Sequence, residues 1–453
     1  MEKKENIREL VVEMVKEISA GKEYSHILIK NVLDKYAYLP SHDRAFMKKV
    51  TEGTIERQIT IDYVLNQFSK VPVNKMKPFI RSLMRTGVYQ ILYLDKVPDS
   101  AVCNEAVKLA EKRGFRNLKG FVNGVLRNVS REKESIAWPD KEKEPAAALS
   151  ILYSMPENLV KLLIAQYGLM AAEEILKGYL VERPVCVRMS KQLTDAQKAE
   201  VLANWEKAGV EYKAHPWLSY AYELTQAGSL GSEAAFQKGY YTVQDVSSML
   251  ICEIADIKEN DYIIDVCSAP GGKALHACDK LKGTGMVDAR DVTEKKTALI
   301  LENKERMHAE NLTVKVWDGC MKDTDVIEKA DIVLLDIPCS GLGVVGRKPE
   351  IRYRLNEDSF AELSVLQKEI ADTVWEYVKP GGTLIYSTCT LRKEENEQMV
   401  SYLTEKYGFA LESLDAYLPK QLHNDDTQKG YLTLLPGEKS DGFFMARLKR
   451  KEN

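Results

Sequence analysis

The stretch DVCSAPGGKALHA, residues 265–277, decides the fold of the C-terminal half of the chain. It continues an apolar run, YIIDVC, and opens a spacing of apolar residues typical of a helix. Glycines at a strand-to-helix turn let backbone amides approach a ligand at the carboxyl edge of a sheet, where doubly wound folds bind nucleotides. The spacing matches neither of the common phosphate-binding glycine motifs, so a phosphate cradle is disfavoured.

Around this stretch, apolar runs alternate with amphipathic segments from about residue 240 to residue 453. The runs are YIIDVC, TGMVDARD, LTVKVWD, ADIVLLD, GGTLIYST and GFFMARL. Strands that alternate with helical patterns predict a mostly parallel sheet covered by helices on both faces. We therefore expect residues 240–453 to form a Rossmann-like α/β domain.

The remainder of the 453-residue chain is too long to belong to the same core, so a multidomain protein is expected. Residues 1–135 show apolar positions at helical spacing and predict an all-α domain. The charged, proline-containing segment 131–148 has the composition of a linker. Residues 150–239 combine a helical pattern with the short strand VCVRMS and predict a small α+β module.

Composition limits the possible functions. The net charge is −3, from 64 basic and 67 acidic residues, which argues against a generally cationic nucleic-acid binder. Two local groups of basic residues could still be binding patches or solvated helix faces: Lys75, Lys77, Arg81 and Arg85, and Lys108, Lys112, Arg113, Arg116, Lys119, Arg127 and Arg131. No apolar run approaches a membrane span, so a cytoplasmic protein without membrane contact is expected. The eight cysteines form no C-x-x-C pair, which disfavours a metal or disulfide framework.

Acidic residues follow the next two predicted strands. Asp291 ends VDARD, and Asp318 follows LTVKVW. An acidic group in the first of these places accepts hydrogen bonds from ribose hydroxyls. Taken singly, each aspartate could be a turn or helix-capping residue. Together with the glycine turn they predict a site for a nucleoside-bearing cofactor, of which S-adenosyl-L-methionine is a common example.

Two cysteines follow two further strands. LLDIPCSGLG, residues 334–343, contains Cys339, and LIYSTCT, residues 384–390, contains Cys389. A helical pattern from Arg392 onward predicts that the Cys389 sulfur lies near a helix N-terminus, which would lower its pKa. Two thiols at one edge allow one to attack while the other handles a proton. The alternative is a pair of redox thiols, which would be expected to lie close in sequence or in a C-x-x-C motif, and this sequence has neither.

The blocks DVCSAPGGK, DIPCSGLG with RKPEIRY, YSTCTLRKEENE and DGFFMARL resemble the signature motifs of RNA cytosine-5 methyltransferases of the NOL1/NOP2/Sun class. TVQDVSS, residues 242–248, resembles the segment before the first block. HDRAFMKKVTEGTIERQ, IRSLMRTGVYQILYLDKVP and FVNGVLRN resemble a NusB-type RNA-binding domain. The combination is similar to the bacterial small-subunit rRNA methyltransferases of that class.

This resemblance implies transfer of a methyl group from S-adenosyl-L-methionine to carbon 5 of the cytosine conventionally numbered 967 in 16S rRNA. It implies that Cys389 attacks the base, that Cys339 assists proton removal and product release, and that Asp336 binds the cytosine edge. The cofactor would be held by Asp291, Asp318, Asp336 and the turn formed by Cys267, Ser268, Ala269, Pro270, Gly271, Gly272 and Lys273. The partner would be 16S rRNA, free or in an early particle, and the protein a monomer.

Three residues depart from the motifs of the class. Gly346 stands where arginine is frequent, Tyr353 where tryptophan is common, and Ser268 where alanine is usual. Arg347, Lys348, Arg352 and Arg354 are candidate contacts to an RNA backbone, or an ordinary basic loop. Transfer RNA or large-subunit rRNA is an alternative substrate, and a non-catalytic ribosome-assembly factor is an alternative function. The sequence Asp336-Ile337-Pro338-Cys339 disfavours amino-group methylation.

Overall fold

The computed structural model describes residues 6–21, 23–228 and 230–452. The chain divides into two compact units, one comprising Met1–Leu180 with Val345–Arg354, and the other comprising Val181–Val344 with Leu355–Asn453. A ten-residue segment from the C-terminal half therefore packs as part of the first unit. The three-part division expected from the sequence remains a prediction about folding units.

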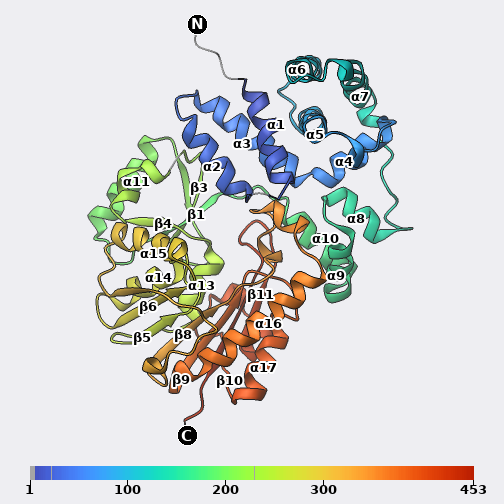
Figure 1. Cartoon of the computed structure of the whole chain (residues 1–453). Helices are drawn as coiled ribbons and strands as arrows, with labels where there is room; N and C mark the ends of the chain where they lie inside the picture. Colours follow the sequence, from blue (N-terminus) through green and yellow to red (C-terminus); the bar gives the residue numbers. More distant parts are fainter. Residues whose placement is uncertain (1–5, 22, 229, 453) are drawn as a thin grey trace. The chain divides into compact units, whose positions relative to one another are not determined.

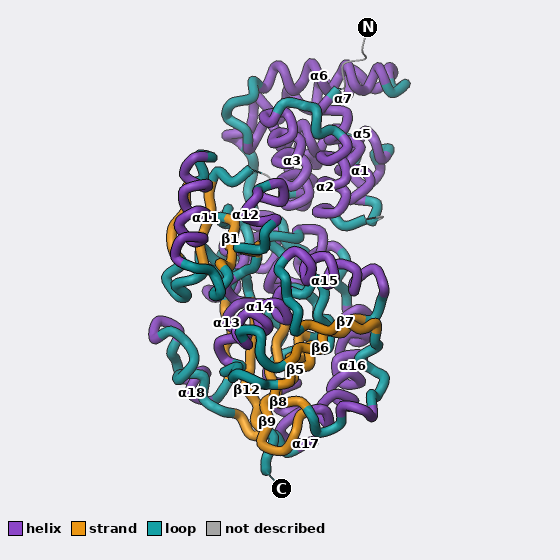
Figure 2. The backbone as a smooth tube through the Cα atoms, turned by 90° about the vertical axis from the view of Figure 1, so that its left-hand side faces the viewer, coloured by secondary structure: helices purple, strands orange, loops and turns teal. Residues whose placement is uncertain are grey.

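The described residues of the first unit form helices and loops without a strand (Figure 2), which agrees with the all-α prediction for residues 1–135. Its longer helices are α1 (Ile7–Ser19), α2 (Ser25–Lys35), α3 (Ser41–Glu56), α4 (Gln58–Phe68), α5 (Pro78–Tyr93), α6 (Asp99–Lys112), α7 (Lys119–Glu132), α8 (Pro145–Tyr153), α9 (Glu157–Tyr167) and α10 (Leu169–Gly178). Proline opens α5 and precedes α6, where its missing N–H costs no helical hydrogen bond. Val88, Ile91 and their neighbours at helical spacing are buried in the common core.

In the described chain, no single helix has the length and hydropathy of a membrane span. The bent pair α8 and α9 passes the same length and composition test when its two helices are taken together.

The segment 345–354 contains a short 3-10 helix, η7 (Pro349–Tyr353). The buried Glu350 carboxylate accepts hydrogen bonds from the backbone amide and the hydroxyl of Ser25, at 3.0 and 2.7 Å. The Tyr353 hydroxyl donates to the carbonyl oxygen of Ile55 at 2.8 Å. The departures at Gly346 and Tyr353 thus fall in a tightly packed segment, where a Cβ on Gly346 would lie 2.8 Å from the Tyr179 carbonyl oxygen.

A small antiparallel sheet begins the second unit. It contains β1 (Val185–Met189), β2 (Glu211–Ala214), β3 (Ala221–Thr225) and β4 (Tyr241–Val243), in the order β2-β3-β1-β4. Two helices accompany it, α11 (Asp195–Lys207) and the short α12 (Ala234–Gln237). Trp205 of α11 is buried against Tyr222 and Tyr241 of the sheet, with ring centroids 5.9 and 5.2 Å away.

The larger sheet follows the order β10-β12-β9-β8-β5-β6-β7, with β11 paired to β12. Its strands are β5 (Tyr262–Asp265), β6 (Met286–Asp291), β7 (Leu312–Val316), β8 (Ala330–Asp336), β9 (Val378–Thr388), β10 (Ala410–Leu411), β11 (Tyr431–Leu434) and β12 (Phe443–Lys449). The strands from β5 to β9 run parallel, and β12 joins them antiparallel. The expectation of a mostly parallel sheet is confirmed.

Helices cover both faces of this sheet (Figure 1). They are α13 (Val246–Ile254), α14 (Gly272–Leu281) and α15 (Glu294–Arg306) on one face and α16 (Glu357–Val374) and α17 (Glu397–Tyr407) on the other, with the short α18 (Asp425–Lys429) near the C-terminal strands. Side chains alternate along each strand, so Ile263 packs with α13 and α14 while Ile264 packs with α16 and α17. Burial on both faces explains why these strands are continuous apolar runs.

The parallel strands bring their carboxyl ends to one edge of the sheet. The chain builds the sheet from β5 outward to β6 and β7 on one side, and β8 and β9 then follow on the other side of β5. The strand order therefore reverses between β5 and β8. In open α/β sheets a ligand binds at such a point. Asp265, Asp291, Asp336 and Thr388, which end four neighbouring strands, therefore mark the candidate site.

Candidate active site

Backbone contacts hold the turn between β5 and α14. The amide of Ser268 donates to the carbonyl oxygen of Arg290 at 2.8 Å, and the amide of Ala269 donates to the Asp291 carboxylate at 3.0 Å. Gly271 has a φ of +99°, and a Cβ there would lie 3.2 Å from the Ile300 side chain. Glycine is therefore required both by the backbone conformation and by the approach of α15.

The next two strand ends fit a nucleoside. One oxygen of the buried Asp291 carboxylate accepts from the Val292 amide at 2.8 Å and lies 3.0 Å from the Lys296 ammonium nitrogen. The other oxygen, which accepts from Ala269, retains a second lone pair for a ribose hydroxyl. Val292, Val316 and Met321 remain 49, 50 and 63% exposed at these strand ends, an apolar surface suited to a planar base. The residues present thus fit S-adenosyl-L-methionine.

Asp318 lies at the same edge in a turn. One of its carboxylate oxygens accepts a hydrogen bond from the Cys320 amide at 2.9 Å, which is the ordinary role of an aspartate in a turn. Its side chain is exposed. The expected contact between Asp318 and the cofactor stays a prediction.

Asp265, which ends β5, is a buried acid that the sequence did not single out as a site residue. Burial raises the pKa of its carboxyl to about 7, against the opposing effects of the Lys273 charge and the Ser268 hydroxyl. Ser268, the third departure from the motifs, is itself buried beside this carboxyl. The turn is thus built over an acid whose ionisation the protein disfavours.

Lys273 joins the cofactor turn to the end of β8. Its ammonium nitrogen lies 2.6 Å from one carboxylate oxygen of Asp336, and the Ser387 hydroxyl donates to the other oxygen at 2.7 Å. Burial acts to lower the pKa of Lys273, but the Asp336 carboxylate raises it above the ordinary value, with smaller effects from Asp265 and Cys389. Asp336 is therefore fixed from two sides and remains half-buried.

The structure brings the two predicted cysteines together. Sγ of Cys339 lies 3.2 Å from Sγ of Cys389, and the Cys389 carbonyl oxygen accepts from the Gly343 amide at 2.8 Å. The hydrogen bond to Cys389 and burial raise the pKa of the Cys339 thiol well above its ordinary value. Strands β8 and β9 pair Asp336 with Ser387, so parallel register explains this proximity.

One local prediction at Cys389 is wrong. The helix expected from Arg392 begins instead at Glu397 with α17, eight residues beyond Cys389 (397 − 389). Residues 393–396 form a turn instead, in which Glu395 binds the Ser340 amide of one cysteine loop and Asn396 binds the Thr390 carbonyl oxygen of the other. No helix N-terminus directly follows the thiol, so any activation of Cys389 has to come from its neighbours.

The basic residues proposed to contact RNA differ in how far their side chains are exposed to solvent. Arg347 and Lys348 are exposed, but Arg352 is 1% exposed and donates to the Ser154 carbonyl oxygen at 2.7 Å. Arg354 donates to the Glu23 carbonyl oxygen. Arg85, from the first basic group, is also buried and pairs with Asp62 at 2.6 Å. Arg352 and Arg85 therefore stabilise the interior and do not offer their charge at the surface.

Comparisons with known proteins agree with this architecture. Residues 253–449 match the model of the family described as 16S rRNA methyltransferase RsmB/F, and residues 5–131 match the NusB family. A Bacillus subtilis protein, "Probable ribosomal RNA small subunit methyltransferase B", is 34% identical and covers 99% of this chain and 100% of its own. "Ribosomal RNA small subunit methyltransferase B" of Klebsiella pneumoniae is 30% identical, with 100% of both chains covered.

Solved structures share the fold. PH0851 has a TM-score of 0.82 at 22% identity, covering 98% of this chain and 99% of its own. NSun6 from Pyrococcus horikoshii, solved with SFG, has a TM-score of 0.57 at 21% identity, covering 67% of this chain and 100% of its own.

The glycine turn, the acidic strand ends and the Rossmann-like sheet define an S-adenosyl-L-methionine-dependent methyltransferase with a NusB-like N-terminal domain. The full-length relatives narrow this class. The chain belongs to the RsmB/F family of 16S rRNA methyltransferases.

Proposed function

We propose that the protein methylates carbon 5 of one cytosine of 16S rRNA, at the position conventionally numbered 967, through a covalent bond between Cys389 and the base. The observation that carries this proposal is the 3.2 Å separation of two thiols beside a carboxylate fixed by Lys273. The names of the full-length relatives support the small ribosomal subunit as the source of the substrate.

The first step follows from the poor nucleophilicity of carbon 5. The Cys389 thiolate adds to carbon 6, and the displaced electron pair makes carbon 5 an enamine carbon. Asp336 faces the amino and ring-nitrogen edge of the base and shares a proton with it, which stabilises the charge that develops there. Lys273 and Ser387 orient this carboxylate for that role.

S-adenosyl-L-methionine, when bound, supplies the methyl group that carbon 5 takes. The Cys339 thiolate then takes the proton from carbon 5, and the electron pair of that C–H bond re-forms the ring double bond as the Cys389 sulfur leaves as a thiolate. A thiol in contact with Cys389 is placed for this task.

Two features favour Cys389 as the attacking thiol. The charge of Lys273 interacts with Cys389, whereas the pKa of the Cys339 thiol is raised by its hydrogen bond to Cys389 and by burial. A nearby cation favours a thiolate, and burial disfavours one. The difference supports Cys389 as the nucleophile. Once ionised, Cys339 is the stronger base of the two, as removal of the carbon-5 proton requires.

The target cytosine has to leave its stack to reach both thiols, which favours a loop or a flipped nucleotide. Transfer of labelled methyl from S-adenosyl-L-methionine to unmethylated small-subunit rRNA, with the modified base mapped, tests the proposal. Label at the single cytosine named above supports it. Label only on transfer RNA or large-subunit rRNA would keep the chemistry and reject the substrate.

A further inference from the structure

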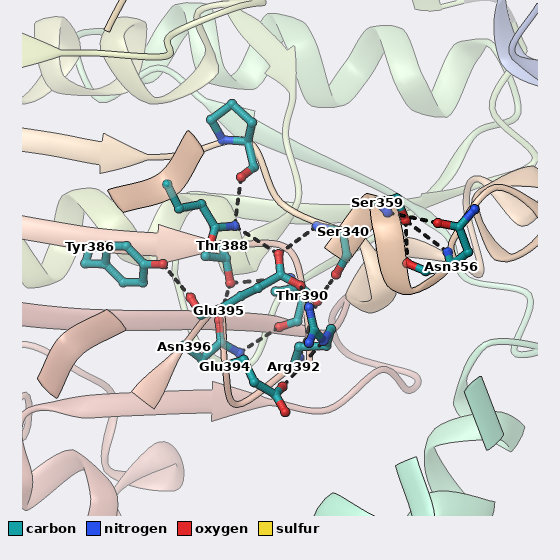
Figure 3. A network of polar contacts seen from close by, with 12 residues as sticks. Ser340, Asn356, Ser359, Tyr386, Thr388, Thr390, Arg392, Glu394, Glu395 and Asn396 are labelled. Atoms are coloured by element: carbon teal, nitrogen blue, oxygen red, sulfur yellow. Dashed lines mark hydrogen bonds and ion pairs between the residues drawn. The ribbon is translucent and has the colours of Figure 1, made fainter. Parts of the chain in front are cut away.

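A polar network lies beside the loops that carry the two thiols, and none of its members is among the candidate site residues. Its centre is Glu395, on the turn between Cys389 and α17, whose side chain is fully buried. Figure 3 shows Glu395 surrounded by Ser340, Thr388, Thr390 and Asn396. Burial of an acid at a distance from solvent requires several donors. The donors that Glu395 binds therefore define what this carboxylate holds in place.

Glu395 bonds to the loop that carries Cys339. One carboxylate oxygen accepts from the backbone amide of Ser340 at 2.8 Å and from the side-chain amide of Gln367 at 2.9 Å. The same Gln367 amide donates to the Pro338 carbonyl oxygen at 2.9 Å. The residues on both sides of Cys339 are therefore tied, directly or through Gln367, to one carboxylate.

Glu395 is also fixed to the loop that carries Cys389. The Tyr386 hydroxyl donates to the Glu395 carbonyl oxygen. Asn396, the next residue, accepts from the Thr388 hydroxyl at 2.6 Å and donates to the Thr390 carbonyl oxygen at 3.1 Å. The backbone of Glu395 is thus anchored to Tyr386, and its neighbour Asn396 binds the residues on both sides of Cys389, while the Glu395 side chain reaches the Cys339 loop.

We propose that Glu395 is the positioning residue that holds the Cys339 loop in register with the Cys389 loop. The proposal rests on the two-thiol chemistry proposed above and deepens it. Glu395 cannot touch RNA because it is fully buried, so it acts only through the loops it joins.

The charge of Glu395 has a second effect, on the pKa of Cys339. After the hydrogen bond to Cys389, burial and the charge of Cys389, the Glu395 carboxylate contributes to the raised pKa of Cys339, while the Gly341 amide opposes it. The residue that positions Cys339 therefore also makes its ionised sulfur a stronger base, which suits removal of the carbon-5 proton. This gives two chemically identical thiols different roles.

The test uses Glu395→Ala and Glu395→Gln in the full-length protein, with Glu394→Gln as the matched control. Glu394 is the adjacent carboxylate, its side chain is 39% exposed, and it lies 3.4 Å from Arg392. Glutamine at 395 can still accept from Ser340, whereas alanine leaves that buried amide without an acceptor.

With small-subunit rRNA as substrate, Glu395→Ala should lower kcat by about tenfold or more and leave KM for RNA within about twofold, because the side chain orients a reacting group without binding substrate. The variant should accumulate a covalent protein–RNA adduct. Glu395→Gln should recover most of kcat, and Glu394→Gln should match the unmodified protein. Wild-type kcat in a folded Glu395→Ala variant overturns the proposal.

A second readout needs no RNA. Phenylarsine oxide joins two neighbouring thiols as two S–As bonds form, the arsenic–oxygen bond breaks and both thiol protons leave with the oxygen as water. Peptide mass mapping should find Cys339 joined to Cys389 in the unmodified protein and several-fold slower joining in Glu395→Ala. If this difference appears but Cys339→Ala gives no RNA adduct, the proposed reaction fails and the positioning role stands.

If Glu395→Ala does not fold, Gln367→Met replaces it. That variant keeps the carboxylate but removes the amide that links it to Pro338. Slower joining of the thiols in Gln367→Met supports the proposal, and an unchanged rate contradicts it.

Discussion

The two halves of the large sheet hold their ligand-edge residues by different means. On the β5-β6-β7 side, the cofactor turn is held by its own backbone, through the Ser268 and Ala269 amides. On the β8-β9 side, Asp336 and the two thiols are held by side chains from several elements, among them Lys273, Ser387 and Glu395. Substitutions on the β8-β9 side should therefore affect the chemical step, and those on the other side should affect cofactor binding.

The largest effect is expected for Cys389→Ala. Without the attacking sulfur, turnover should fall by about a thousandfold or more, as for other enzymes that lose a nucleophile. Cofactor binding should stay near the unmodified value, because the cofactor turn lies in the other half of the sheet. Methyl transfer and calorimetric titration with S-adenosyl-L-methionine measure the two quantities. Full activity of Cys389→Ala would show that Cys389 is not the nucleophile.

The next largest effect is expected for Cys339→Ala. This variant should attack and methylate the base but release it slowly, since the assisting thiol is lost. Denaturing gels should show a protein–RNA adduct, and methyl transfer should stop near one turnover. Release at the normal rate would show that another group takes the proton from carbon 5.

Two lysines of the β5-β6-β7 side pair with carboxylates in different halves, Lys273 with Asp336 and Lys296 with Asp291, and so compare the halves through these partners. Lys273→Met removes the partner of Asp336 and should lower kcat by about a hundredfold, the size expected for loss of preorganised charge. Lys296→Met removes an exposed partner of Asp291 and should raise KM for the cofactor only about twofold, as expected for a half-exposed ion pair. Steady-state kinetics with RNA and S-adenosyl-L-methionine varied in turn measure kcat and both KM values for each variant. Equal effects on kcat would contradict the division between the halves.

The smallest effect concerns stability and pH. Because the pKa of folded Asp265 is about 7 and its ordinary value is 3.8, the native state binds more protons than the unfolded state between these values. Stability should therefore fall as pH rises through this window, and Asp265→Asn should reduce that fall. Urea unfolding at pH 5, 6, 7 and 8 measures it. A variant that loses stability with pH as steeply as the unmodified protein would show that other groups cause the decline.

The sequence could predict the sheet, the helical N-terminal region and the meeting of Cys339 with Cys389. Those features follow from apolar periodicity and from the rule that parallel strands end at one edge. Ser387, Gln367 and Glu395 escaped prediction because their roles depend on strand register and on side chains far apart in sequence. Ser387 becomes a partner of Asp336 only once β8 and β9 pair.

Local propensity also failed where tertiary contacts override it. The residues after Cys389 have a helical pattern, but Asn396 and Glu395 bond to the cysteine loops and delay the helix to Glu397. In the sequence, Arg352 belongs to a basic segment that resembles a surface loop. In the structure it is buried and donates to the carbonyl oxygens of Ser154 and Glu56. Neither outcome has a signal in the neighbouring residues.

The most direct test of the account is to identify the cysteine that bonds to RNA. Small-subunit rRNA containing 5-fluorocytidine should trap the enzyme, because fluorine at carbon 5 cannot leave as a proton does. Protease digestion and mass spectrometry then locate the attached base. A single cytosine should be attached to the peptide that contains Cys389. Attachment at Cys339, or methylation without any covalent adduct, would contradict it.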